Sequence, residues 1–203
     1  MTFFHIFVVI LAGTACVRLC AVEANRAEFI TAGQEEEPIT SGACGPNVNW
    51  TFDNATHTLS LSGSGGMFYY FYSHNVPWYN LSSEIERIEM SENITYIGNY
   101  AFDGCSSLTS IKIPENVNSI GSYAFYKCSK LTSINIPDKV TRIEDGTFQG
   151  CSSLTTIKIP ENVTSIGSGA FYECSNLTSI NIHDKVTMIE DYTFYGCSSL
   201  KTI

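Results

Sequence analysis

One period dominates the chain, because the same residues return every 23 positions from about residue 82 to residue 203. An isoleucine, a phenylalanine and a cysteine mark it most clearly. They recur as Ile97, Ile120, Ile143, Ile166 and Ile189, as Phe102, Phe125, Phe148, Phe171 and Phe194, and as Cys105, Cys128, Cys151, Cys174 and Cys197. A fixed period of this length is typical of a solenoid, in which each repeat forms one coil and stacked coils bury a shared core.

The unit over residues 105–127 indicates how one coil folds. Ile111 and Ile113 alternate with polar residues, which predicts a short strand with one buried face. Pro114 follows and ends the strand, because proline cannot donate a hydrogen bond to a sheet. Further apolar positions lead to Phe125, whose ring we expect in the core. The sequence therefore predicts a β-rich solenoid of short parallel strands, with one helical turn in each coil.

The repeated pattern L-x-x-I-x-I-P-x-x-V-x-x-I-x-x-x-A-F-x-x-C resembles the BspA-like leucine-rich repeats, a 23-residue class found on surface proteins of bacteria and parasitic protists. The resemblance covers five full units and a truncated sixth over residues 82–203. Its departures are Ser82, Ile85 and Met90 in the first unit, Thr147 and Thr193 in place of alanine, and His183 in place of proline. The resemblance implies a leucine-rich repeat fold and a role in adhesion to host matrix proteins or other cells.

A longer period of two units lies over the short one. Residues 105–150 and 151–196 differ at only nine of 46 positions, and within them Lys-Ile-Pro-Glu-Asn-Val alternates with Asn-Ile-(Pro/His)-Asp-Lys-Val. Duplication of a two-coil block is the simplest explanation. The last unit stops in mid-repeat at Ile203, and we therefore expect the sequence to be a fragment or a gene remnant.

The N-terminal region carries the features of a secreted protein. Residues 3–15 are apolar and end in small residues, which predicts a secretory signal peptide over residues 1–21. The alternative is an uncleaved signal anchor that spans a membrane. Residues 22–41 are polar, with an acidic run and no apolar period, and we interpret them as a flexible leader. These features predict a secreted or cell-surface location, with no membrane span in the mature chain.

Residues 42–81 form a different region, which we interpret as an N-terminal cap with a hairpin and an aromatic segment. Alternating residues around Trp50 and Leu59, separated by the turn signal Asp53-Asn54, predict the hairpin. Seven large aromatic residues follow within residues 68–79. Since the first coil of a solenoid must be covered, we expect them to close its open end. The alternative is an aromatic platform for a sugar or a host protein.

Composition and motifs exclude several classes of function. The net charge of −9, with 11 lysines and arginines, argues against a nucleic-acid partner. The chain contains no motif of a zincin, a serine hydrolase or a P-loop nucleotide-binding protein. Its cysteines form no C-x-x-C pair and lie apart from the four histidines, so we expect no metal site. We predict a non-enzymatic protein without a cofactor.

The repeated cysteines recur at one position of the coil, beside the phenylalanine that points inward. Neighbouring coils would bring their Cα atoms to about 4.8 Å, within the range of disulfides, but parallel side-chain directions give poor torsion geometry. We therefore expect buried thiols that act as small apolar fillers. Cys44 has no evident partner in the sequence.

Outward-facing residues of the predicted strands form the candidate ligand surface, because the strand face is the usual ligand surface of leucine-rich repeats. Ten residues make up this strand face: Arg87, Glu89, Ser110, Lys112, Ser133, Asn135, Thr156, Lys158, Ser179 and Asn181. The partners implied by the resemblance are host or neighbouring-cell surface proteins, matrix proteins or glycans. Alternatively the face is solvated, and the protein is a structural or antigenic spacer without a dedicated ligand.

Six N-x-S/T sequons provide candidate glycosylation sites, at Asn49, Asn54, Asn80, Asn93, Asn162 and Asn176. The preceding two-coil block has no sequon at the positions of Asn162 and Asn176. Glycans are therefore not required by the coil, and chance sequons in an Asn/Thr-rich chain are the alternative.

Overall fold

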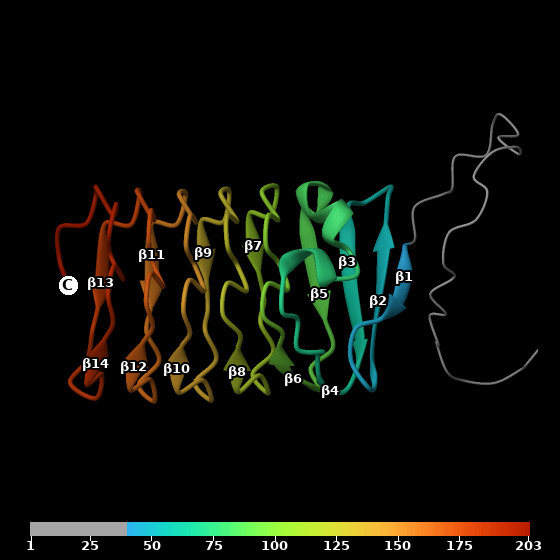
Figure 1. The fold of residues 1–203 in the computed structure, drawn as a ribbon, viewed down its shortest axis with the longest axis horizontal. Helices are drawn as coiled ribbons and strands as arrows, with labels where there is room; N and C mark the ends of the chain where they lie inside the picture. The colour runs from blue at the N-terminus through green and yellow to red at the C-terminus, as the bar shows by residue number, and fades with distance from the viewer. Residues whose placement is uncertain (1–39) are drawn as a thin grey trace, which may run out of the picture. The chain divides into compact units, whose positions relative to one another are not determined.

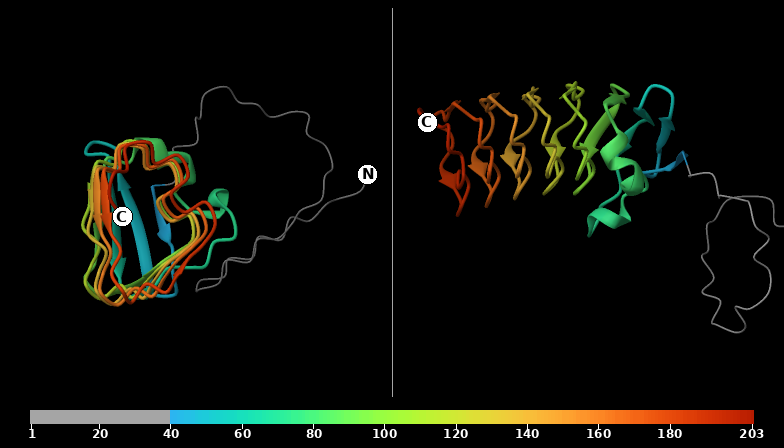
Figure 2. Two further views of the ribbon diagram at one scale, coloured as in Figure 1. Left: turned by 90° about the vertical axis from the view of Figure 1, so that its left-hand side faces the viewer. Right: turned by 90° about the horizontal axis from the view of Figure 1, so that it is seen from above.

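The computed structural model describes residues 40–203, whose backbone winds into successive coils that stack along one axis (Figure 1). Seen along this axis, the coils of the repeat region lie nearly on top of one another (Figure 2). The predicted signal peptide over residues 1–21 and all but the last two residues of the predicted leader lie outside the described residues. Within the part described, no helix has the length and apolar character needed to cross a bilayer.

Each coil contributes a short strand to each of two sides of the stack. The first side contains β5 (Arg87–Met90), β7 (Ser110–Ile111), β9 (Ser133–Ile134), β11 (Thr156–Lys158) and β13 (Ser179–Asn181). The second side contains β4 (Gly65–Gly66), β6 (Ile94–Ile97), β8 (Ser119–Ile120), β10 (Arg142–Ile143), β12 (Ser165–Ile166) and β14 (Met188–Ile189). The fold class is thus confirmed as a β-rich leucine-rich repeat solenoid.

Parallel pairing joins each strand to its equivalent in a neighbouring coil. On the first side β7 pairs with β9 and β11 with β13, and a bridge between Asn135 and Lys158 joins the two pairs. On the second side the strand orders are β4-β6-β8 and β10-β12-β14. Pairs in the repeats such as Ile111 with Ile134 and Ile166 with Ile189 are 23 residues apart. The sequence period therefore equals one turn of the solenoid.

The repeated phenylalanines form one continuous stack in the core. Phe102, Phe125, Phe148 and Phe171 are fully buried, and their ring centroids lie 5.3–5.6 Å apart. Isoleucine, leucine and valine side chains from both sides pack around the rings. One coil could not bury such a ring alone, so each coil depends on its neighbours.

The predicted helical turn of each coil consists of successive turns closed by hydrogen bonds between residues three apart. In one coil, Ala124 donates to the carbonyl of Gly121 and Cys128 to that of Phe125. A residue in the left-handed region is needed within this segment, and Tyr123 (φ 57°) and Gly146 (φ 58°) fill equivalent positions. The same segment bonds to the next coil, since the N–H of Phe125 donates to the carbonyl of Thr147.

The N-terminal part continues the first side of the stack. β1 (Ser41–Ala43), β2 (Val48–Asp53) and β3 (Thr58–Gly63) run antiparallel, and β3 pairs in parallel with β5. The strands β2 and β3 form the hairpin, with Asp53 accepting the N–H of Ala55 at its turn. The two 3₁₀ helices η1 (Ser73–Asn75) and η2 (Tyr79–Glu84) then project from the side of the coils (Figure 2).

Candidate functional site

All ten residues of the predicted strand face are exposed. Eight lie on strands of the first side, whereas Lys112 directly follows β7 and Asn135, which follows β9, forms a single bridge with Lys158. Parallel register places equivalent residues beside one another, as with Thr156 beside Ser179 and Lys158 beside Asn181. Between them the isoleucines point inward, and this alternation gives β11 an exposed, buried, exposed pattern. The structure therefore brings the ten residues onto one polar surface. Whether a ligand binds there remains a prediction.

The two strand-face lysines have different surroundings. The Nζ atom of Lys112 lies 2.8 Å from Oε1 of Glu92, and this hydrogen bond raises the pKa of the lysine. Lys158 has no ion-pair partner among residues 40–203. Because Lys112 is already paired with a carboxylate, Lys158 and Arg87 are the cations of this face that have no ion pair within residues 40–203 and can meet an anionic group.

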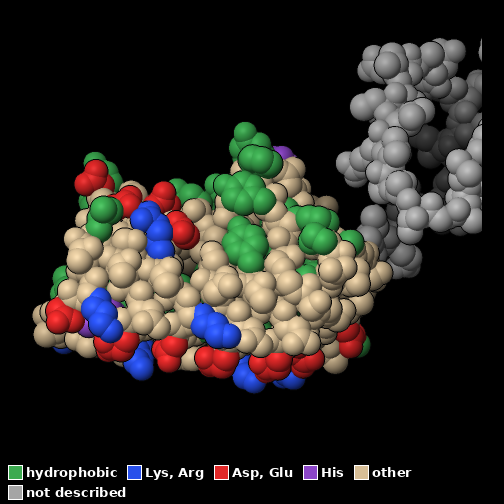
Figure 3. Space-filling view, turned by 90° about the horizontal axis from the view of Figure 1, so that it is seen from below, with side chains coloured by type: hydrophobic (Ala, Val, Ile, Leu, Met, Phe, Trp, Pro, Cys, Tyr) green, Lys and Arg blue, Asp and Glu red, His purple; other side chains and the backbone are tan. Residues whose placement is uncertain are grey.

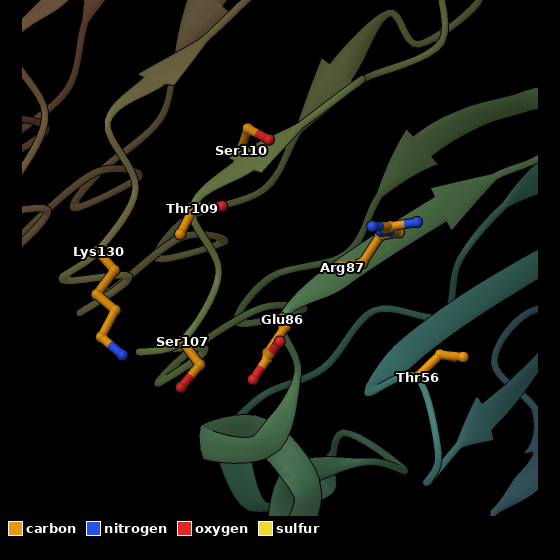
Figure 4. A pocket seen from close by; sticks show the side chains of 7 residues that line it. All are labelled: Thr56, Glu86, Arg87, Ser107, Thr109, Ser110 and Lys130. Atoms are coloured by element: carbon orange, nitrogen blue, oxygen red, sulfur yellow. The ribbon is translucent and has the colours of Figure 1, made fainter.

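A polar hollow of about 400 Å³ opens where the N-terminal part meets the repeats (Figure 4). It is lined by Thr56, Glu86, Arg87, Ser107, Thr109, Ser110 and Lys130. Arg87 and Ser110 belong to the predicted strand face, whereas the other five were not predicted as site residues. Two of these five depart from the repeat, which is a sequence signal: Glu86 stands where later coils have threonine, and Lys130 where Ser107 and Ser153 stand.

The aromatic segment over residues 68–79 divides into two groups. Tyr70 and Trp78 are buried, and the indole of Trp78 donates a 2.8 Å hydrogen bond to the carbonyl of Ala101. Trp78 also stacks on Phe102 with centroids 6.3 Å apart, so it extends the core stack toward the N-terminus. The remaining aromatic residues are exposed: Phe68, Tyr69, Phe71, Tyr72 and Tyr79. Figure 3 shows hydrophobic side chains standing in groups on an otherwise mostly polar surface.

A pair of tyrosines on the turns adds to the aromatic surface. The rings of Tyr100 and Tyr123 stack with centroids 5.2 Å apart and planes inclined by 4°. Tyr126 meets Tyr123 edge to face at 6.0 Å. Partial burial raises the pKa of Tyr100, and the nearby phenol of Tyr123 adds to the effect. The signal for this pair was present in the sequence, because the two tyrosines are 23 residues apart.

The repeated cysteines are free thiols, as predicted, and four of the five are buried. Cys128, Cys151, Cys174 and Cys197 each donate from Sγ to the carbonyl of the phenylalanine 26 residues earlier, at 3.1 Å. Burial raises the pKa of Cys151 to about 12. A protonated, buried thiol is a poor nucleophile and a poor metal ligand, so this cysteine ladder is a structural element.

All six sequon asparagines are exposed on the surface. They lie on β2 (Asn49), in the hairpin turn (Asn54), in η2 (Asn80) and in turns of the coils (Asn93, Asn162 and Asn176). The side chain of Asn162 donates to the carbonyl of Asp138 at 2.7 Å. Exposure permits glycosylation, which remains a prediction at each site.

No cluster of three or more metal-ligating side chains occurs among residues 40–203. His183, which replaces a turn proline, contacts the carbonyl of Pro160 through Nε2 at 2.8 Å. His57 lies at the end of the hairpin turn, against the ring of Phe52.

Comparison with known proteins agrees with this geometry. The family described as "BspA type Leucine rich repeat region" matches residues 77–201 in six copies. No curated protein matches the chain.

Solved structures of bacterial leucine-rich repeat proteins are similar to the chain. A leucine-rich repeat protein from Eubacterium ventriosum is 29% identical with a TM-score of 0.65, over 80% of this chain and 43% of that one. A leucine rich cell surface protein from Faecalibacterium prausnitzii is 30% identical with a TM-score of 0.60, over 81% of this chain and 39% of that one. A Treponema pallidum leucine-rich repeat protein, 24% identical with a TM-score of 0.60 over 75% of this chain and 77% of that one, shares the fold. The chain thus spans less than half the length of the first two.

Proposed function

Because the chain belongs to the BspA-type leucine-rich repeat family, we propose that it is a non-enzymatic recognition protein, secreted or displayed at the cell surface, that binds proteins or glycans. The strand face is the proposed contact surface. Adhesion to host matrix or to neighbouring cells is the proposed role.

One observation carries the proposal. Ten exposed polar or charged side chains recur at two positions of the coil along the first side, and parallel pairing places those of β7 and β9, and those of β11 and β13, beside one another. Such a surface presents a hydroxyl in each coil from Ser110 to Ser179, at intervals of about 4.8 Å, and an ammonium or an amide in alternate coils, at intervals of about 9.6 Å. Repetition suits a repetitive partner, because several weak contacts then act together.

The proposed location has support from two sources. The apolar stretch over residues 3–15 has the composition of a signal peptide. A similar solved structure is described as a leucine rich cell surface protein. All six sequon asparagines of the chain are exposed, which is compatible with passage through a glycosylating secretory pathway.

Attachment to immobilised matrix proteins and glycans tests the proposal. Replacing Lys158 by glutamate reverses an unpaired charge of the strand face, so attachment should fall several-fold, and added salt should weaken attachment of the unaltered protein. Lys139→Glu is the matched control, because Lys139 is an exposed lysine on a turn outside the strand face. Circular dichroism should show both variants folded.

The outcomes separate the two functional readings. Loss with Lys158→Glu and retention with Lys139→Glu would support strand-face binding. If both variants attach as strongly as the unaltered protein, the contact lies on another surface. Absence of attachment to every member of the panel would favour the structural spacer.

A further inference from the structure

Neighbouring coils are joined by a threonine ladder at the entrance to each strand of the first side. The N–H groups of Thr132, Thr155 and Thr178 donate to the carbonyl of the threonine one coil earlier, at 3.1, 3.3 and 3.0 Å. Their hydroxyls donate to the same carbonyls at 3.2, 3.5 and 3.1 Å. Each of these threonines therefore uses both donors to bond to the preceding coil.

This ladder is interrupted at its first step. Within residues 40–203, neither the N–H nor the hydroxyl of Thr109 bonds to the carbonyl of Glu86, one coil earlier. The strand that Glu86 precedes, β5, pairs with β3 and not with β7. The polar hollow lies at this break, where the carbonyl of Glu86 and the N–H of Thr109 do not bond to each other, while the N–H of Glu86 donates to the carbonyl of His57 at 3.0 Å.

Three charged residues line the hollow, and each departs from the repeat. Glu86 occupies the position of Thr109, Arg87 that of Ser110, and Lys130 that of Ser107. None of the three forms an ion pair with any residue of the described chain. In Figure 4 the side chains of Glu86 and Lys130 extend toward Ser107 from opposite sides. These three residues differ from the repeat, lie together where the threonine ladder is interrupted, and have unpaired charges. This combination favours a role in ligand binding over a role in packing.

We propose that this hollow binds a carboxylated sugar unit of a glycan, such as a uronic or sialic acid. Arg87 and Lys130 supply two cations for the carboxylate, and Arg87 can form a bidentate pair with it. The hydroxyls of Thr56, Ser107, Thr109 and Ser110 can each donate or accept, as sugar hydroxyls require. The carboxylate of Glu86 accepts hydrogen bonds from sugar hydroxyls. An anion without hydroxyl groups cannot form these bonds and is only repelled by Glu86.

The lining and the size of the hollow limit the alternatives. Every lining side chain is polar or charged, so a predominantly apolar ligand would find no partner surface. The volume of about 400 Å³ lies near the small end of ligand sites, which range over about 300–1,000 Å³. One or two sugar units match this size. An acidic peptide would supply carboxylates but few hydroxyls for the four hydroxyl side chains.

This inference rests on the proposed recognition function and names a ligand class for one edge of the strand face. It can be tested with soluble probes and the full-length protein at low ionic strength. A hyaluronan tetrasaccharide supplies uronic acid and a methyl sialoside supplies sialic acid. Lactose, sodium sulfate and a glutamate-rich peptide serve as the neutral, inorganic and peptide probes. Titration calorimetry gives the affinities, and backbone amide shifts locate the bound probe.

The variants restore the repeat and so preserve the fold. Arg87→Ser and Lys130→Ser introduce the residues found at the same position in other coils. Each should weaken binding of the acidic saccharide by roughly tenfold or more, since each removes a charge-assisted hydrogen bond. Lys139→Asn is the matched control, because Asn116 and Asn162 occupy that position in neighbouring coils and Lys139 lies outside both the hollow and the strand face. It removes a lysine outside the hollow and should leave the affinity unchanged.

The expected result is binding of at least one carboxylated saccharide with shifts at Thr109 and Ser110, and no binding of lactose or sulfate. Absence of binding by both acidic saccharides, equal affinity for lactose, or affinity unchanged in Arg87→Ser and Lys130→Ser would overturn the inference. Preference for the glutamate-rich peptide would overturn it in favour of a peptide site. If the inference fails while attachment to immobilised partners still depends on Lys158, the proposed function stands without it.

Discussion

The rings of Phe125 and Phe148 lie nearly parallel, with centroids 5.6 Å apart and planes inclined by 8°. Phe148 in turn stacks on Phe171 at 5.5 Å. Both faces of the Phe148 ring are therefore covered by rings of adjacent coils. A ring enclosed in this way couples three coils, and its removal should affect more than its own repeat.

Phe148→Ala should lower the free energy of unfolding by about 3–5 kcal/mol, because it leaves a cavity in a close-packed stack. Urea unfolding followed by circular dichroism measures the loss. Phe194 is the matched control: its ring is only half-buried and stacks on Phe171 at 5.6 Å, so Phe194→Ala should cost clearly less. Equal losses for the two variants would contradict the proposed coupling along the stack.

The coil itself could be predicted from sequence because its determinants repeat. Equivalent positions in successive coils share the same environment, so a position that is apolar in each repeat is buried and one that is polar in each repeat is exposed. The inward direction of Phe125 and the outward direction of Lys158 followed from this pattern. Parallel pairing of equivalent residues then followed from stacking. In a repeat protein the sequence itself identifies the neighbouring strand. The sequence of a single strand does not show which other strand it pairs with.

The sites that break the pattern could not be predicted in the same way. Glu86 and Lys130 lie 44 residues apart in the chain, and nothing local in the sequence shows that they share a hollow. The partner of Lys112, Glu92, belongs to a turn of the preceding coil whose geometry has no sequence signature. The sequence of residues 68–79 does not show which of its aromatic side chains are buried and which are exposed. That depends on which of them the coils cover in the folded protein.

Trp78 and Phe71 provide a test of that division. Trp78 is fully buried, stacks on Phe102 and donates to the carbonyl of Ala101, whereas the side chain of Phe71 is 72% exposed. Trp78→Ala should cost about 3–5 kcal/mol of unfolding free energy. Phe71→Ala should change it by about 0.5 kcal/mol or less. Thermal and urea unfolding distinguish these results, and a large loss with Phe71→Ala would assign that ring to the core.

Arg142 joins two coils through carboxylates on the second side. Its guanidinium lies 2.8 Å from Glu144, 2.8 Å from Glu190 and 3.8 Å from Asp145. Arg142→Met, which introduces the residue of the equivalent position 188, should leave these carboxylates without their cation. We expect a loss of about 1 kcal/mol that shrinks at high salt.

Lys112→Met is the comparison for Arg142→Met, because it breaks a single ion pair whose side chains are 80% and 61% exposed. We expect no resolvable loss of unfolding free energy for this pair, because water screens both exposed charges. Urea unfolding at low and at high salt measures both variants. A loss with Arg142→Met that does not respond to salt would show that the arginine acts through packing of its aliphatic stem and not through charge.

The cysteine ladder predicts that the protein loses stability in alkali. Burial raises the pKa of Cys151 to about 12, whereas a thiol in the unfolded chain titrates at about 8.5. Between these values the unfolded chain releases a proton that the folded protein retains. The free energy of unfolding is therefore fully maintained below about pH 8.5 and falls as the pH rises toward 12. Each such thiol should contribute a slope of up to about 1.4 kcal/mol per pH unit.

Urea unfolding under a phosphine reductant, at about pH 8, 9 and 10, measures the slope of the unfolding free energy against pH. Cys151→Ala should make it shallower, and an unchanged slope in that variant would assign the alkaline loss to other groups.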